Sequence, residues 1–170
     1  MINLFWRLLA KLLAWRPIAN YIIKRSQRTP YFHLDGYMLR WWVFNPYDAE
    51  THVARYSWCP WSIRVHRILR EDLGRHLHDH PWNARTIILS GWYEEQRLGD
   101  WLAGQVLIPY TRRAGCTAKL NFNEYHHISK VSPGGVFTLF ITGPKQGTWG
   151  FLVDGVKVEW RRYLGHEDAA

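Results

Sequence analysis

The sequence predicts an all-β protein, a two-sheet jelly roll or barrel, preceded by N-terminal amphipathic helices. Short β-rich runs begin after Pro30, turn residues separate them, and neither α/β alternation nor a glycine-rich phosphate loop occurs. The 170 residues are 47% hydrophobic and 16% aromatic, which suffices for one buried core and excludes a disordered chain. Nine or ten strands are expected, in the candidate runs 37–44, 63–69, 85–89, 92–97, 105–109, 118–122, 126–131, 136–142, 149–153 and 157–163.

The net charge of +8 is concentrated at the N-terminus. Residues 1–34 contain six basic and no acidic side chains, which leaves 16 basic against 14 acidic side chains for the rest of the chain. A nucleic-acid-binding domain spreads its basic residues over a face of the fold, so no nucleic-acid partner is expected. The two cysteines, Cys59 and Cys116, are too few for a disulfide framework or a Cys-based zinc module, and a reducing, cytoplasmic location is expected.

Residues 1–30 are expected to form a helical arm, and residues 31–170 the β-barrel domain. Leucines and a phenylalanine recur at helical spacing within residues 2–15, which predicts an amphipathic helix. Pro17 suits the first turn of a second helix over residues 18–24.

The apolar face of the first helix needs a partner. Arg7 and Lys11 interrupt the apolar run, so it is too short for a membrane span, and no secretory cleavage site follows it. The face is expected to pack on the domain or on a second copy in a homodimer; peripheral contact with an anionic membrane is the alternative. The leucines expected to pack are Leu8, Leu9, Leu12 and Leu13.

Histidines cluster at two places in the chain. His76, His78 and His80 alternate along one segment and share a face if that segment is extended, and His126 and His127 form a second dense spot. Imidazoles converging from two strands suit a divalent ion such as Fe, Ni, Zn or Mn. The pattern therefore predicts a metal site built from both clusters.

These histidines resemble the two sequence motifs of the cupin superfamily. The first motif pairs H-x-H with a Glu after three or four residues and a Gly six residues later. Here His78 and His80 are followed by Ala84 at the Glu position and by Gly91. The resemblance covers roughly residues 60 to 163 and implies a cupin-type jelly-roll barrel.

The second motif selects His126 rather than His127. It runs Gly, five residues, Pro, one residue, Gly, two residues, His, and Gly115 and His126 stand in that register. Asn121 and Asn123 occupy the Pro and second Gly positions, and Asn tolerates left-handed backbone angles.

Four short segments look more closely like a group of uncharacterised bacterial and phage cupin-like proteins. They are H-D-H-P-W at 78–82, S-G at 90–91, T-G-P at 142–144 and W-G-F at 149–151. The likeness to this group implies a fold and no activity.

The resemblance implies one divalent metal ion, Fe, Ni, Zn or Mn, held by His78, His80 and His126. Ala84 removes the usual carboxylate ligand and leaves a three-His site, as in cupin-like thiol dioxygenases, which use Fe(II) and O₂. Three neutral ligands leave the full charge on the ion, so the site favours an anionic ligand and keeps a coordination position open.

Several neighbours are candidates for a ligand pocket or for proton transfer. The residues considered for ligand binding are His76, Trp82, Arg85, Tyr125 and His127. Core packing is expected for most of the aromatic residues that could wall a pocket, Trp82, Trp92, Phe140 and Trp149. The acid/base candidates are Glu94, Glu95 and Tyr125, while Asp79 is expected behind the ligands or at the surface.

The expected function is that of a metal-binding cupin-like protein, a metal-dependent oxygenase or isomerase acting on a small anionic molecule. The alternative is a non-catalytic barrel that binds a small ligand or a sugar, which the loss of the carboxylate at Ala84 favours. The sequence leaves open whether the protein is an enzyme.

Overall fold

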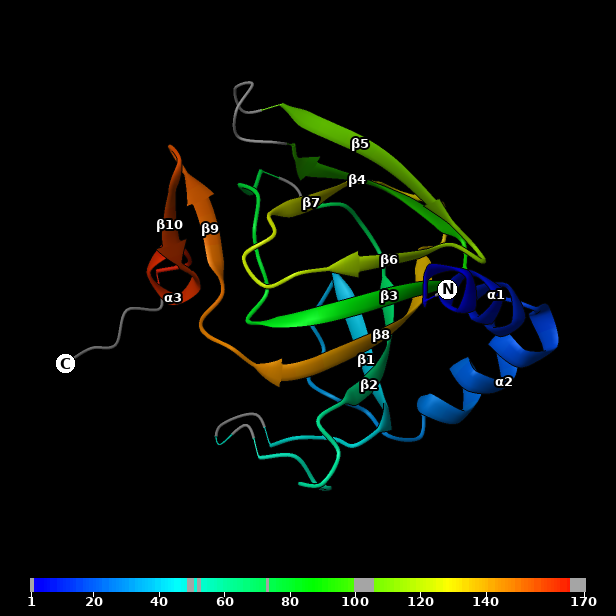
Figure 1. Cartoon of the computed structure of the whole chain (residues 1–170). Coiled ribbons are helices and arrows are strands. Elements are labelled where there is room, and N and C mark those ends of the chain that lie inside the picture. The colour runs from blue at the N-terminus through cyan, green and yellow to red at the C-terminus, as the bar shows by residue number, and fades with distance from the viewer. Residues whose placement is uncertain (1, 49–50, 52, 73, 100–105, 166–170) are drawn as a thin grey trace.

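The computed structural model describes residues 2–48, 51, 53–72, 74–99 and 106–165, which form β-sheets with helices at both ends of the chain (Figure 1). No helix among these residues is long and apolar enough to cross a membrane. The helices are α1 (Ile2–Leu13), α2 (Arg16–Ser26) and the short α3 (Trp160–Tyr163). The strands are β1 (Met38–Phe44), β2 (Ser62–Ile68), β3 (Trp82–Ser90), β4 (Trp92–Leu98), β5 (Leu107–Arg113), β6 (Thr117–Leu120), β7 (His126–Val131), β8 (Val136–Lys145), β9 (Gly150–Val153) and β10 (Val156–Glu159).

The strands form two facing layers. The larger sheet has the antiparallel order β1-β2-β8-β3-β6, and a smaller sheet has the order β5-β4-β7. The extended residue His78 bridges His126 of β7 and Phe151 of β9, so it joins the β9-β10 ribbon to the smaller sheet. Ile88 of the larger sheet packs against Ile128 of the smaller one inside the barrel. The predicted two-sheet barrel is confirmed.

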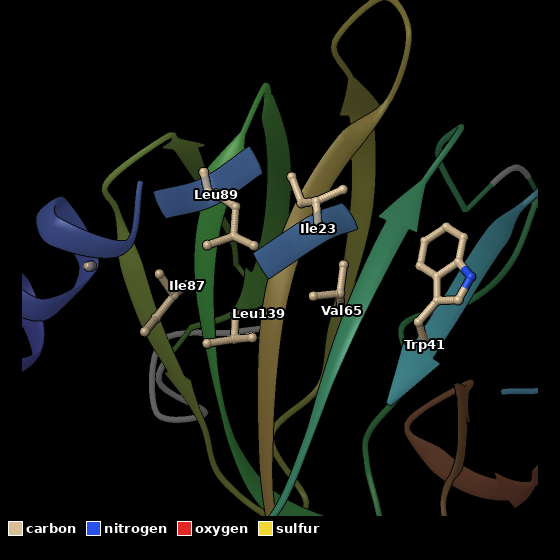
Figure 2. Packing of buried hydrophobic residues seen from close by; sticks show 8 residues of the cluster. Ile23, Trp41, Val65, Ile87, Leu89 and Leu139 are labelled. Carbon is tan, nitrogen blue, oxygen red and sulfur yellow. The ribbon is translucent and has the colours of Figure 1, made fainter. Parts of the chain in front are cut away.

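Strand alternation gives the larger sheet two different faces. Its outer face is apolar and packs under α1 and α2, through Ala10, Ala19 and Ile23 of the helices (Figure 2). The strand residues of this cluster are Trp41, Val65, Ile87, Leu89 and Leu139. The inner face of the same strands carries polar side chains, among them Arg64 and His66, and faces the barrel interior.

Helix α1 uses only part of its apolar surface to dock. Ala10 is fully buried, and Trp6 and Leu13 pack on the same cluster. Leu8 and Leu12 do not pack on the domain, because these side chains are 59% and 54% exposed, and their packing on a second copy stays a prediction. The stripe of large apolar residues is wider than the face that the sheet covers. The division of the chain at residue 30 stays a prediction.

Strand β5 is longer than predicted. The predicted run ended at Pro109, and its first residue, 105, lies outside the described residues. In the structure β5 continues to Arg113, and Pro109 pairs with Gln96 of β4. Proline lacks an N–H donor and is tolerated here because β5 is an edge strand of its sheet.

The predicted strand over residues 157–163 is half wrong, because the chain turns into α3 after Glu159. The Glu159 carboxylate accepts a hydrogen bond from the Arg161 N–H at 2.9 Å, which caps this turn. Trp160 then stacks on Trp149 with ring centroids 5.5 Å apart, and Tyr163 stacks on Phe151. These ring contacts favour the helical turn over a continued alternation.

Candidate metal centre

Three imidazoles converge on the wall of the barrel interior. His78 and His80 lie in the extended segment before β3, and His126 is the first residue of β7. One nitrogen from each ring lies within 4.8 Å of the other two, and Nε2 of His80 is 3.0 Å from Nε2 of His126. Two ring lone pairs at that distance repel each other unless a proton or a cation lies between them.

The main chain determines which side chains meet. His78 exchanges both backbone hydrogen bonds with His126, at 2.9 and 3.0 Å, so the two residues are directly opposed. Because alternate residues share a face, His80 points the same way as His78, and Asp79 points away. Asp79 is fully buried and accepts hydrogen bonds from the Gly150 N–H and from Lys157 Nζ. It therefore anchors the β9-β10 ribbon rather than the centre itself.

Two carboxylates stand behind the imidazoles. Oε2 of Glu95, on β4, is 3.4 Å from Nδ1 of His126, and Oδ2 of Asp72 is 4.0 Å from Nδ1 of His78. Both contacts are electrostatic, since neither has the geometry of a hydrogen bond. A carboxylate at Nδ1 of His126 favours the tautomer that carries its proton there, which directs the Nε2 lone pair towards His80.

Glu95 is ionised although it is fully buried. Burial raises the pKa of its carboxyl group, but the close contact with His126, followed by the charges of Arg97 and Arg112, outweighs burial and lowers this pKa to about 2. The carboxylate accepts hydrogen bonds from Nε of Arg112 at 2.7 Å and Nε of Arg97 at 3.1 Å. Of the two glutamates considered in the sequence, Glu94 faces outwards and pairs with Lys130 at 3.3 Å.

Two of the three imidazoles, those of His78 and His80, are held in the neutral form that binds metals. Burial, followed by the charge of His126, lowers the pKa of His78 to about 3 and that of His80 well below its ordinary value. Neutral imidazole nitrogens need to release no proton on metal binding at neutral pH. The donor set therefore fits a divalent transition-metal ion.

The carboxylate position of the first motif is filled by apolar packing. Ala84 is buried on the inner face of β3, where it packs with Leu120, Phe140 and Trp82. Among the described residues, the group of metal-binding side chains comprises three histidines and no carboxylate. This apolar packing occupies the place of the usual carboxylate ligand and explains why the predicted set contains three histidines alone.

A cavity of about 390 Å³ adjoins the three histidines and extends between the sheets. Arg64 of β2, which is only 3% exposed, also lines this cavity. The guanidinium donates to the Tyr47 hydroxyl at 2.9 Å, while its Nε has no hydrogen-bond partner. No carboxylate of the described residues lies within ion-pair distance of Arg64. Its carbon Cζ lies 5.3–5.7 Å from the ring centroids of Tyr31, Trp42, Tyr47, Trp82 and Phe140.

His66 lies beside Arg64 on the same inner face and also lines the cavity. Burial, followed by the charges of Arg64 and Arg40, lowers the pKa of His66 well below its ordinary value. Its Nε2 has no hydrogen-bond partner. Sequence reasoning did not assign Arg64 and His66 to the site, because alternation places them on one face of β2 without indicating that this face lines a cavity.

The residues considered for ligand binding fall in different places. Trp82 lines the cavity, as do Phe140 and Trp149 of the predicted aromatic wall, whereas Trp92 does not. Arg85 is not among the cavity-lining residues, because it lies on the outer face of β3. There it stacks on Trp6 of α1, with Cζ 4.5 Å from the ring centroid.

The remaining three candidates are not among the cavity-lining residues. His76 is exposed and its Nδ1 hydrogen-bonds with the Tyr163 hydroxyl at 2.9 Å. His127 follows His126 and so faces the other side of β7. Burial, followed by the charge of Asp79, raises the pKa of Tyr125 to about 12. The predicted ligand role of these residues is therefore not supported by their positions.

Solved structures with a similar fold include oxalate decarboxylases and an oxalate oxidase. An oxalate decarboxylase of Lactobacillus farciminis in complex with formate aligns at 14% identity and a TM-score of 0.52, covering 82% of this chain and 36% of that one. A Bacillus subtilis oxalate decarboxylase with Mn(II) centres aligns at 11% and 0.53, over 84% and 32%. An oxalate oxidase aligns at 13% and 0.53, over 83% and 72%.

The fold is a cupin-type jelly-roll barrel. The chain spans about a third of the length of the two oxalate decarboxylases. At the level of sequence, no protein-family model and no curated protein matches this chain.

Proposed function

We propose that the chain is a metal-dependent enzyme of the cupin type that acts on a small organic anion. The observation that carries the proposal is the convergence of His78, His80 and His126 on the wall of a cavity, with the ionised Glu95 behind His126. A divalent ion bound there supplies a Lewis acid with open coordination positions. Oxygenase and isomerase reactions are the two classes that we propose.

The charge of the cavity supports an anionic substrate. The partners of the buried Arg64 guanidinium among the described residues are aromatic rings and the Tyr47 hydroxyl rather than an acid, so an anion that enters the cavity would supply the missing counter-charge. A guanidinium binds a carboxylate or a phosphate through two parallel hydrogen bonds. The rings of Trp82 and Phe140 lie within 5.7 Å of the guanidinium and within 6.4 Å of the His80 ring. A molecule with a few carbon atoms can therefore reach both the Arg64 guanidinium and the His80 ring.

His66 offers a neutral polar group on the same cavity-lining face of β2 as Arg64. Its ring centroid lies 4.9 Å from that of Phe140, and its Nε2 is unpartnered. Because the imidazole remains neutral, Nε2 can donate a hydrogen bond to the substrate or accept a proton from it. Removal of this group should affect turnover more than metal binding.

The solved structures suggest a probe for the proposal. The three aligned enzymes are named for reactions of oxalate, and one of these structures is a complex with formate. Protein loaded with Co²⁺ should therefore change its visible absorption when oxalate or formate is added, because an anion enters an open coordination position.

Arg64→Met is the informative variant, and Arg67→Met is its matched control on the outer face of the same strand. Arg64→Met should weaken oxalate binding by about tenfold to a hundredfold, the usual contribution of a hydrogen bond to a charged group, and leave Co²⁺ affinity unchanged. Arg67→Met should resemble the wild type, since Arg67 reaches the Gly134 carbonyl outside the cavity. Equal oxalate affinity in all three proteins would contradict the anion site.

One observation favours the second candidate, a non-catalytic barrel that binds a small ligand. The Glu position of the first motif is occupied by Ala84 and closed by Leu120 and Phe140. Ligand binding of equal strength in Co²⁺-loaded and metal-free protein would support this candidate over the enzyme.

A further inference from the structure

The outward face of α1 is apolar and has no partner among the described residues. Leu4, Phe5, Leu8 and Leu12 are 54–61% exposed, and Trp15, directly after the helix, is 61% exposed. At about 100° per residue, the four residues of α1 fall in one sector roughly 100° wide. This outward face is therefore a continuous stripe and differs from the scattered apolar side chains that any surface carries.

The opposite face of α1 is docked on the larger sheet, so the exposure of the outward face does not mean that the helix is detached from the domain. Ala10 is fully buried, and Trp6 and Leu13 pack on the cluster formed with the larger sheet. The helix is therefore held in place by one side while its other side stays in solvent. A partner that covers the outward face would bury it without unfolding anything.

The charge around the outward face identifies the partner. Residues 1–34 contain six basic and no acidic side chains, and all six are exposed. Arg7 and Lys11 border the outward face on the α1 wheel, and Arg16 begins α2. An apolar stripe bordered by Lys and Arg is the arrangement of helices that lie in the interface of an anionic membrane.

We propose that α1 and the turn after it bind an anionic lipid surface. Leu4, Phe5, Leu8, Leu12 and Trp15 enter the interface between headgroups and acyl chains, while Arg7, Lys11 and Arg16 contact the headgroups. A second copy of the chain fits this face less well. In a two-fold dimer the same surface meets itself, so the basic residues would face like charges with no acid of the arm to compensate them.

The fold keeps the cavity accessible in this orientation. The helices cover the outer face of the larger sheet, whereas the cavity lies against its inner face. Trp149 and Trp160, which line the cavity, belong to the β9-β10-α3 side of the molecule, opposite α1 and α2 in Figure 1. Attachment through α1 leaves that side directed away from the lipid.

The test is co-sedimentation of the full-length protein with vesicles. Vesicles of phosphatidylglycerol and phosphatidylcholine should bind the protein in low salt and release it as salt rises, and phosphatidylcholine alone should bind it weakly. Arg7→Gln combined with Lys11→Gln should weaken binding to the anionic vesicles by about thirtyfold, the joint effect of two basic side chains near such a surface.

Leu8→Ser combined with Leu12→Ser should weaken the same binding by at least about tenfold. The matched control is Val53→Ser combined with Val156→Ser, which alters two side chains that are 65% and 66% exposed elsewhere. It should bind like the wild type, and both double variants should keep the wild-type unfolding temperature.

Three outcomes would overturn the proposal. The first is no binding to anionic vesicles, and the second is binding that neither Leu8→Ser/Leu12→Ser nor salt reduces. The third is a wild-type dimer, measured by light scattering, that Leu8→Ser/Leu12→Ser converts to a monomer, which would assign the outward face to a second copy.

Discussion

Replacement of Glu95 by Gln tests whether a charge behind a ligand tunes the centre. The carboxylate lies 3.4 Å from Nδ1 of His126 and is fully buried, and its pKa of about 2 keeps it charged across the usual assay range. Gln preserves the shape and one acceptor oxygen but removes the charge. His126 then loses the group that favours a proton on Nδ1 and a lone pair on Nε2.

Two magnitudes follow for Glu95→Gln. Loss of an outer carboxylate of this kind weakens metal affinity by about tenfold to a hundredfold. Stability falls as well, because Arg97 and Arg112, whose side chains are 11% and 20% exposed, lose their shared anion. Removal of one partner from a buried ion pair costs about 3–5 kcal/mol, and we expect the lower end because the amide oxygen still accepts a hydrogen bond.

Two further variants separate the effects on metal affinity and on stability. Glu94→Gln, at the next residue of β4, removes an exposed pair with Lys130 and should cost at most about 0.5 kcal/mol without changing metal affinity. Arg112→Gln should destabilise the fold while leaving the Glu95 carboxylate behind His126, so its metal affinity should stay within about threefold of wild type.

The assays are calorimetric titration of the metal-free protein with Zn²⁺ and unfolding by urea. The reasoning about Glu95 would be refuted if Glu95→Gln bound Zn²⁺ as tightly as Glu94→Gln does. It would also be refuted if Arg112→Gln lost as much Zn²⁺ affinity as Glu95→Gln, because the carboxylate would then act only through stability.

Two other predictions concern the barrel itself. The pKa of His66 is lowered by burial and then by Arg64 and Arg40, so below about pH 6.5 the unfolded chain binds the extra proton and stability falls on acidification. Below about pH 6.5, the free energy of unfolding of metal-free His66→Gln, measured with urea, should fall by about 1 kcal/mol less per pH unit than that of the metal-free wild type. An equal dependence on pH in the two proteins would contradict this prediction. Asn45 has φ +48° and hydrogen-bonds with Cys59 and Trp61, so Asn45→Ala should cost about 3 kcal/mol. Asn45→Gly should recover about 1 kcal/mol, and equal losses in the two variants would contradict the backbone part of this argument.

The fold could be predicted because its signals are local. The strands are recognisable in the sequence by alternation of polar and apolar residues or by a short apolar run. The turns contain residues suited to left-handed backbone angles, such as Asn123 with φ +63°. The errors have tertiary causes. Pro109 is tolerated only because β5 has a free edge, and Glu159 ends β10 because two aromatic stacks hold the turn that follows.

The three histidines could be predicted to converge because their spacing in the sequence determines which faces of the strands they occupy. His78 and His80 share a face through alternation, and the register of the second motif selects His126. The groups around them depend on contacts between distant strands, which no local pattern contains. Arg85 faces α1 and Arg64 faces the cavity, because the helices cover one face of the larger sheet and leave the other to line the barrel interior. Only the folded sheet shows which face is covered.

The measurement that tests the central claim most directly is the metal content of purified protein, determined by elemental analysis after reconstitution with Zn²⁺. Wild type and His127→Ala should each retain about one ion per chain, because His127 faces away from the other imidazoles. His80→Ala should retain almost none, since it removes one of three ligands. Equal metal content in wild type and His80→Ala would contradict the metal centre and the enzyme that we propose around it.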